Sequence, residues 1–209
     1  MMEDVINLMG IKELTISYGM TETSPTTFLT RPEDTFGQKT STVGSIMPYT
    51  EGKIVGEDGS ILPRNEKGEV LTRGYCIMKG YWGDIEATKA SIDEDGWMHT
   101  GDIGIVDDEG YLQIVGRLKD MIIRGGENIY PKEIEEYLLR NESVENVQIF
   151  GFPDKKMGEE VFAWIKVREG RKMTKEDVLE YCKGKIAHYK IPKYVKFVDC
   201  FPITVTGKP

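Results

Sequence analysis

The chain has 209 residues, 39% of them hydrophobic and 30% charged, which is the mixture of a folded globular protein rather than a disordered one. Its net charge is −8 and it has no long run of Lys and Arg, so we expect no binding to nucleic acid, which requires clustered cations. No apolar run approaches the roughly 20 residues that cross a bilayer, and no secretory signal begins the chain. We therefore expect a cytoplasmic protein with no transmembrane segment.

Cysteine and histidine usage predicts reduced thiols and no metal centre. Cys76, Cys182 and Cys200 lie far apart and form no C-x-x-C pair, so we expect mostly buried, unpaired thiols. His99 and His188 have no neighbouring ligands at metal spacing, so we expect neither to bind a metal.

The first residues predict the end of a larger domain. A helix is expected over 3–9 and a short strand over 12–17, followed by a turn at Gly19. One helix and one strand cannot bury their apolar faces alone. We therefore expect them to be the last piece of an α/β domain whose earlier part is absent.

The middle of the chain predicts an antiparallel β-structure. Turns rich in Gly, Asn and Asp separate apolar runs, and one helix is expected over 85–91. The expected strands are 43–47, 52–55, 69–73, 97–99, 103–106 and 111–115. This pattern predicts a small antiparallel β-barrel or sandwich.

The last part predicts a small α+β domain. Pro131 suits the first turn of a helix that runs to about residue 140, and Thr174 with Asp177 resembles a capping box that begins a second helix. Strands are expected over 144–150, 161–167 and 194–198. The whole chain is therefore predicted to be mixed α+β, with domains over 1–117 and 118–209.

Two segments contain residues that could bind a nucleotide. In the run Tyr18-Gly19-Met20-Thr21-Glu22, Tyr18 could stack on a base, Thr21 could donate to a phosphate and Glu22 could hold Mg²⁺, which favours oxygen ligands. Asp102, after a glycine at a strand end, could accept both hydroxyls of a ribose. The alternative for each segment is an ordinary polar turn.

Two further segments lie at the predicted boundary and at the end of the chain. Arg117 is well placed to contact a ligand between domains, and Gly125-Gly126 permits positive φ and close approach to a ligand. Lys208, beside a glycine, could reach a phosphoryl group as a point charge. The alternatives are a solvated linker, a simple turn and an exposed lysine, and the chain has no Walker phosphate loop.

In their order and spacing these segments resemble the adenylate-forming superfamily of acyl-CoA synthetases, non-ribosomal adenylation domains and luciferases. The motifs that carry the resemblance are Tyr-Gly-x-Thr-Glu at 18–22, Gly-Tyr-Trp at 80–82, Thr-Gly-Asp at 100–102, Gly-Arg at 116–117, the run from Gly125 to Glu135, and Pro-x-Thr-x-Thr-Gly-Lys at 202–208. The sequence Gly-Gly-Glu-Asn-Ile-Tyr-Pro at 125–131 most resembles that of fatty and medium-chain acyl-CoA synthetases.

The resemblance implies an enzyme that uses ATP, Mg²⁺ and coenzyme A to activate a carboxylic acid, as in fatty acid metabolism. The implied roles are nucleotide binding for Tyr18, Gly19, Met20, Thr21, Asp102 and Arg117, Mg²⁺ binding for Glu22, catalysis of adenylation for Lys208, hinge motion at Lys119, and shaping of the coenzyme A channel for Gly125 and Gly126.

The family's phosphate loop precedes the Tyr-Gly-x-Thr-Glu motif and is absent from this sequence. We therefore expect a C-terminal fragment of an acyl-CoA ligase that needs the missing N-terminal part of its own enzyme as a partner and cannot form acyl-adenylate alone. A homodimer is left open. Three alternatives remain: an adenylation domain that loads a carrier protein, a luciferase-type oxygenase, and a non-catalytic lid or binding module.

Overall fold

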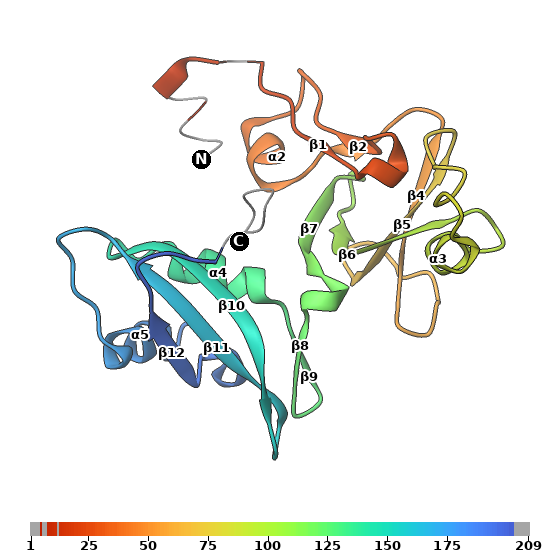
Figure 1. The fold of residues 1–209 in the computed structure, drawn as a ribbon. Helices are drawn as coiled ribbons and strands as arrows, with labels where there is room; N and C mark the ends of the chain where they lie inside the picture. Colours follow the sequence, from red (N-terminus) through yellow and green to blue (C-terminus); the bar gives the residue numbers. More distant parts are fainter. Residues whose placement is uncertain (1–4, 6–7, 12, 203–209) are drawn as a thin grey trace. The chain divides into compact units, whose positions relative to one another are not determined.

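The computed structural model describes residues 5, 8–11 and 13–202, and it divides into two compact units, Met1–Leu118 and Lys119–Pro209 (Figure 1). Each unit has its own hydrophobic core. The predicted helix over 3–9 falls mostly outside the described residues, although Val5, Leu8 and Met9 are helical. None of the described helices is long and apolar enough to cross a membrane.

The first unit contains a small antiparallel sheet with the strand order β1-β2-β3. Its strands are β1 (Ser17–Tyr18), β2 (Phe28–Leu29) and β3 (Ser45–Ile46), with a 3-10 helix η1 (Thr21–Thr23) and a helix α2 (Phe36–Ser41) between them. The strand predicted over 12–17 was wrong in its extent. Ile16 bonds instead to Thr30, whose backbone N–H donates to the Ile16 carbonyl and whose hydroxyl accepts the Ile16 N–H at 2.7 Å.

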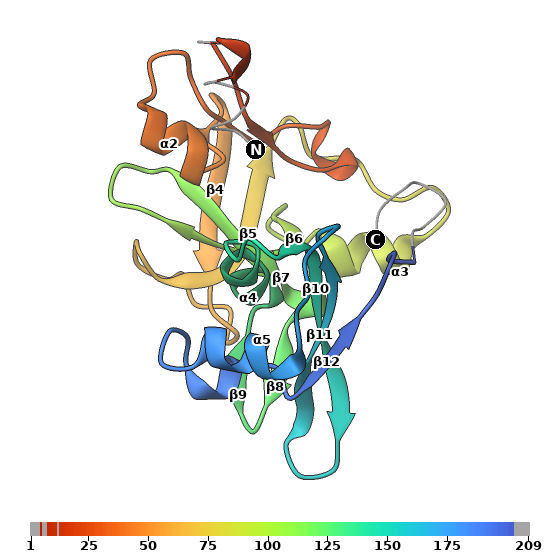
Figure 2. The ribbon, with the colours of Figure 1, turned by 90° about the vertical axis from the view of Figure 1, so that its left-hand side faces the viewer.

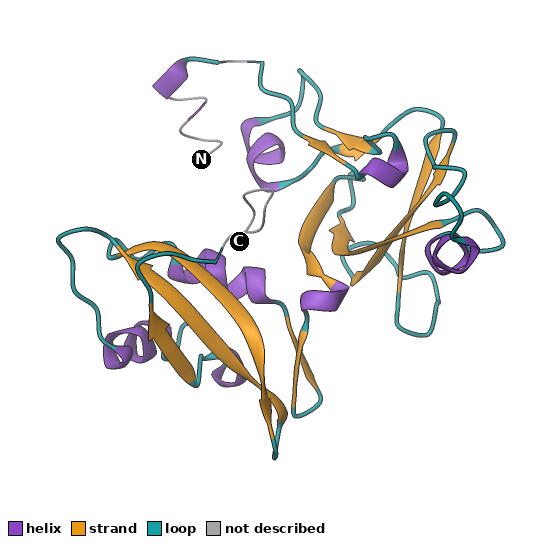
Figure 3. Ribbon diagram, viewed as in Figure 1, coloured by secondary structure: helices purple, strands orange, loops and turns teal. Residues whose placement is uncertain are grey.

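A second sheet of this unit has four antiparallel strands in the order β4-β5-β6-β7. These are β4 (Thr50–Val55), β5 (Lys67–Gly74), β6 (Met98–Val106) and β7 (Leu112–Arg117), and α3 (Ile85–Ser91) lies between β5 and β6 in the chain (Figure 3). The runs 97–99 and 103–106, predicted as two strands, belong to the single strand β6.

Of the two predicted forms, barrel or sandwich, the structure excludes a closed barrel, because β4 and β7 do not pair with each other in the described part of the chain. Closure is not needed to bury the apolar face. The small sheet packs there instead, so that Phe28 of β2 joins Ile54, Val70 and Leu112 in one core. The broader prediction of a mixed α+β fold is confirmed.

The second unit is built on one mixed sheet. Its strands are β8 (Ile122–Arg124), β9 (Glu127–Ile129), β10 (Val144–Asp154), β11 (Gly158–Val167) and β12 (Tyr194–Phe197), in the order β10-β11-β8-β9 with β12 also paired to β11. Figure 2 shows β10, β11 and β12 side by side. β12 runs parallel to β11 because helix α5 (Lys175–Cys182) lies between them in the chain.

The two faces of this sheet differ. Alternate residues of β11, namely Val161, Ala163 and Ile165, are buried in a core shared with α4 (Pro131–Leu138) and α5. The intervening positions belong to a half-buried aromatic face made of Phe150, Phe152, Phe162, Trp164 and Tyr194, whose rings lie 5.1–5.8 Å apart.

All three thiols are free, as the sequence predicted, with Cys76 and Cys182 buried and Cys200 exposed. Burial raises the pKa of Cys76 and raises that of Cys182 to about 11. The two buried thiols are therefore protonated at neutral pH and poorly nucleophilic.

Candidate functional site

The carboxylate of Asp102 is the centre of a polar cluster in the first unit. Asp102 lies directly opposite Arg117 in the antiparallel pair of β6 and β7, and Arg117 Nε donates to Asp102 Oδ1 at 3.0 Å. The hydroxyl of Tyr18, 84 positions earlier in the chain, donates to Asp102 Oδ2 at 2.7 Å. The structure thus brings together three of the predicted nucleotide-binding residues.

Tyr18 is held in a protonated, donating state. Burial of the ring raises the pKa of its hydroxyl far above the ordinary value, and the hydrogen bond to Asp102 adds to the rise. Its ring packs edge-on against Phe28, with ring centroids 6.1 Å apart. A carboxylate offers about four lone-pair positions, so two donors leave Asp102 able to accept further hydroxyls.

The turn after β1 requires glycine at one position. A Cβ on Gly19 would lie 1.8 Å from the carbonyl oxygen of Pro25, which is far inside van der Waals contact. The buried Thr23 closes the turn, because its hydroxyl accepts the backbone N–H of Met20 at 2.9 Å. Thr21 is the first residue of η1. The close turn therefore fixes the backbone between Tyr18 and Thr21.

Glu22 follows in η1 and is held by the loop after β5. Tyr81 donates its hydroxyl to Glu22 Oε1 at 2.8 Å, and the backbone N–H of Met78 donates to the Glu22 carbonyl at 2.8 Å. The second carboxylate oxygen has no hydrogen bond among the described residues. The described residues contain no group of three or more Asp, Glu, Cys or His side chains that could bind a metal ion. One carboxylate fits Mg²⁺ that is bound mainly by substrate phosphates and water.

In the second unit, Gly125 and Gly126 form the turn between β8 and β9. Both have positive φ, 60° and 89°, as a tight two-residue hairpin requires. The Gly125 N–H donates to the Met157 carbonyl at 2.8 Å, and a Cβ on Gly125 would lie 2.5 Å from the end of the Met157 side chain. Lys119 is exposed in the short helix η2 (Leu118–Asp120).

A charge network beside this turn was not predicted. Arg124 Nε donates to Glu160 Oε2 at 2.5 Å, and Lys193 Nζ donates to Glu160 Oε1 at 3.2 Å and to Asp154 Oδ2 at 2.8 Å. Glu160 is almost fully buried. No local sequence pattern indicates this network, because its residues come from the three strands β8, β10 and β11 and from the loop before β12.

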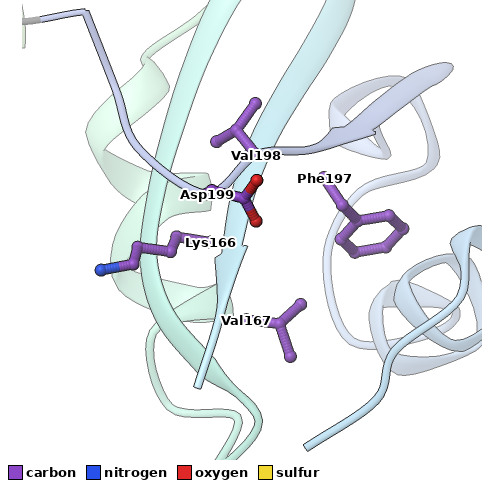
Figure 4. Close-up of a pocket in the computed structure, with 5 residues that line it drawn as sticks. All are labelled: Lys166, Val167, Phe197, Val198 and Asp199. Carbon is purple, nitrogen blue, oxygen red and sulfur yellow. The ribbon is translucent and has the colours of Figure 1, made fainter. Parts of the chain in front are cut away.

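A shallow pocket of the second unit contains none of the predicted site residues. It is lined by Lys166, Val167, Phe197, Val198 and Asp199, and Figure 4 shows the Lys166 amine directed away from the Asp199 carboxylate. Lys166 is instead paired with Glu145 at 2.5 Å. The pocket therefore offers no convergent polar groups, and we assign it no function.

The remaining predicted residue, Lys208, lies outside the described residues. Sequence reasoning missed Tyr81 and Thr100 as neighbours of the site, although both stand in motifs that carried the resemblance. Thr100 supports Asp102 directly, because its hydroxyl accepts the Asp102 backbone N–H at 3.1 Å.

Known proteins match this chain along nearly its whole length. The family described as AMP-binding enzyme matches residues 1–82, and the AMP-binding enzyme C-terminal domain matches residues 133–208. The mitochondrial medium-chain acyl-CoA ligase ACSF2 of Mus musculus is 49% identical over 205 residues, 98% of this chain and 33% of the relative. YngI of Bacillus subtilis (strain 168) is 51% identical over 209 residues, 99% of this chain and 38% of the relative.

A solved structure gives the same result at the level of the fold. The o-succinylbenzoate CoA synthetase MenE from Bacillus subtilis, in complex with the acyl-adenylate intermediate OSB-AMP, matches with a TM-score of 0.86 at 34% identity, covering 99% of this chain and 41% of that chain. The chain spans about a third of the length of the curated relatives it matches. On these matches, the chain belongs to the AMP-binding family of adenylate-forming enzymes.

Proposed function

We propose that this chain supplies the ribose site and the coenzyme A channel of an ATP-dependent acyl-CoA ligase. The whole enzyme would join a carboxylic acid to AMP and then pass the acyl group to coenzyme A. The observation that carries the proposal is the Asp102 carboxylate, whose two oxygens accept from Tyr18 at 2.7 Å and from Arg117 at 3.0 Å. The membership of the family and the medium-chain ligase among its relatives support the same reaction.

In the first reaction a substrate carboxylate oxygen would attack the α-phosphorus of ATP, and pyrophosphate would leave. Asp102 would accept the ribose hydroxyls while Arg117 fixes the carboxylate, and Tyr18 would lie against the adenine. Gly19, Met20 and Thr21 would line the phosphate side of the nucleotide. Lys208 would stabilise the negative charge that develops on the transferred group.

Glu22 would hold Mg²⁺, which supplies positive charge to the triphosphate. Tyr81 leaves one oxygen of this carboxylate for such a contact by binding the other at 2.8 Å. This arrangement agrees with the preference of Mg²⁺ for a few carboxylate oxygens together with phosphate.

In the second reaction the thiol of coenzyme A would attack the acyl carbon, and AMP would leave. We propose that Lys119 is the hinge about which the second unit changes its orientation between the two reactions. The turn of Gly125 and Gly126 would then shape the channel for the thiol, since glycines with positive φ expose backbone without a side chain. Conformational steps of this kind often separate two chemistries in one enzyme.

The acid is proposed to be a fatty acid, because the medium-chain ligase ACSF2 of Mus musculus is 49% identical to this chain. The cytoplasmic location stays a prediction, and the question of a homodimer stays open.

The test is carboxylate-dependent exchange of pyrophosphate into ATP. One sample contains the 209-residue chain alone. The other contains a chimeric ligase in which this chain replaces the matching 205 residues of the mouse ligase. We expect no exchange by the chain alone and exchange by the chimera, followed by acyl-CoA formation when coenzyme A is added.

Exchange by the chain alone would contradict the proposal that an upstream phosphate loop is required. An inactive chimera that folds and binds no ATP would contradict the proposed function itself. If the chimera forms acyl-adenylate but transfers the acyl group only to a carrier protein, the acceptor is that carrier protein and not coenzyme A.

A further inference from the structure

Strand β6 contains a large bulge at the residues that carry Asp102. Glu69 pairs with Ile103 and Leu71 pairs with His99, so the three residues Thr100, Gly101 and Asp102 lie opposite the single residue Val70. Gly101 has a φ of +67°, which a residue with a Cβ rarely adopts. Bulges of this kind redirect a side chain and are frequent beside active sites.

Two backbone N–H groups of the bulge, those of Gly101 and Asp102, donate to side chains. Asp102 N–H donates to the Thr100 hydroxyl at 3.1 Å, and that hydroxyl donates to the Val70 carbonyl at 2.7 Å. Gly101 N–H donates to Glu69 Oε1 at 3.1 Å. The shape of the bulge therefore depends on two side chains, one within it and one on β5.

Glu69 is itself fixed by a second contact. Its other oxygen, Oε2, lies 3.0 Å from His99 Nδ1, on the residue that immediately precedes the bulge. The Glu69 side chain is 17% exposed and that of His99 38% exposed, so the pair is partly shielded from water. The Glu69 carboxylate thus contacts the residue before the bulge, His99, with one oxygen and the middle of the bulge, Gly101, with the other.

We infer that Glu69 and His99 are positioning residues for the ribose-binding carboxylate. They hold the bulge in the conformation that directs Asp102 towards Arg117 and Tyr18, and they touch no substrate themselves. The inference rests on the proposed function. It adds two residues that neither the motifs nor the cluster around Asp102 contained.

The test uses the chimeric ligase and compares ATP with 2′-deoxy-ATP and 3′-deoxy-ATP. If Glu69 acts through Asp102, Glu69→Ala raises KM for ATP more than it lowers kcat, and it reduces the preference for ATP over the deoxy analogues about tenfold. Glu69→Gln retains an acceptor for the Gly101 N–H and restores most of the preference. His99→Ala produces a smaller loss in the same direction.

Glu51→Ala is the matched control. Glu51 lies on the neighbouring strand β4 and is paired with Arg73 at 2.7 Å, so the change also removes a paired glutamate from this sheet. It is far from the bulge in the strand register, and we expect the preference for ATP to stay unchanged.

A purely structural role of Glu69 would lower activity with ATP and with the deoxy analogues by the same factor, and that result overturns the inference. If Glu69→Ala does not fold, Gly101→Ala tests the bulge instead, since an added Cβ meets nothing within 4 Å and acts only through φ. An unchanged preference in Gly101→Ala would equally overturn it. If the unsubstituted chimera did not prefer ATP over the deoxy analogues, that result would contradict both the proposed function and this inference.

Discussion

At Gly19 the chain passes so close to the Pro25 carbonyl oxygen that a methyl group has no room. Gly19→Ala forces the turn after β1 to open, because the Cβ would lie 1.8 Å from the Pro25 carbonyl oxygen. We expect a loss of about 1–3 kcal/mol in the free energy of unfolding, as for other overpacked sites. KM for ATP in the chimeric ligase should rise as Tyr18 shifts from Asp102.

The control for this change is Gly37→Ala. Gly37 lies in α2 and an added Cβ would meet nothing within 4 Å. Alanine is the better helix former, so Gly37→Ala should be neutral or slightly stabilising. Equal thermal unfolding of the two variants would show that the contact at Gly19 is relieved without cost.

In the second unit, the side chain of Glu135 in α4 contacts the backbone of β10. Glu135 Oε1 accepts the backbone N–H of Ile149 at 2.8 Å, and burial raises the pKa of this carboxyl group. Glu135→Ala leaves the Ile149 N–H buried without an acceptor, so we expect a loss of about 1–3 kcal/mol. Glu135→Gln retains the acceptor and removes a desolvated charge, so at pH 7 it should be at least as stable as the parent.

Urea unfolding followed by the fluorescence of Trp164, on the adjacent strand β11, measures both Glu135 variants. If Glu135→Gln were as destabilised as Glu135→Ala, the charge itself and not the acceptor would be what stabilises this region.

The sequence named Tyr18, Asp102 and Arg117 as candidate site residues but did not predict the contacts among them. Tyr18, Asp102 and Arg117 stand in motifs that resemblance recognises. The hydrogen bond from Tyr18 to Asp102 joins residues 84 positions apart and depends on how two sheets pack. No local pattern contains that information. Glu69 was missed for the same reason, since its partners lie on another strand.

From the network of Lys193, Asp154 and Glu160 we expect the stability of the second unit to depend on pH. Hydrogen bonds from Lys193 hold the pKa of Asp154 well below its usual range, and Arg124 lowers that of Glu160. A carboxyl group with a lowered folded pKa stabilises the fold above its unfolded value, near 4, and loses this effect as the pH falls. We therefore expect the free energy of unfolding to decrease as the pH is lowered below about 4.

Lys193→Met should reduce stability at pH 7 and make the decline below pH 4 shallower, because less stabilisation remains to be lost. Urea unfolding at pH 7, 4 and 3 measures the difference. Lys183→Met is the control, since Lys183 lies 3.7 Å from Glu180 with both side chains more than 70% exposed. If the free energy of unfolding decreased equally with pH in the Lys193 variant and in the parent, the network would not be the cause of the decrease.

Elements with strong local signals were predicted well, and those that depend on partners were not. Helix α3 and helix α5 follow capping residues, Asp84 and Thr174, that the chain itself provides. The short helix α2 was missed because Gly37 weakens its signal. Strand β6 was divided in two because Gly101 and Asp102 are disfavoured in strands, and side chains of β5 and of the bulge hold them there.

For the whole molecule, the division between Leu118 and Lys119 supports a prediction about the two reactions. Proline at 119 suits the φ of a 3-10 helix but fixes it, so Lys119→Pro should prevent the change in orientation that we propose for the second unit. In the chimeric ligase we expect near-normal pyrophosphate exchange and at least a tenfold loss of acyl-CoA formation from preformed acyl-adenylate.

Lys208→Ala should show the opposite pattern, with exchange reduced on the order of 10²–10³-fold and thioester formation largely spared. Equal losses in both reactions for either variant would contradict the roles assigned to the hinge and the lysine.

The pairing of Asp102 with Arg117 also limits how this protein can vary. Both residues belong to one hairpin, whose turn is closed by the Asp107 side chain accepting the Tyr111 N–H at 2.8 Å. One residue added to or deleted from that turn would shift β7 by one position and point Arg117 to the opposite face of the sheet. We therefore expect the length of the 107–110 turn to be nearly invariant among functional homologues, while the exposed turn at 57–60 tolerates insertions.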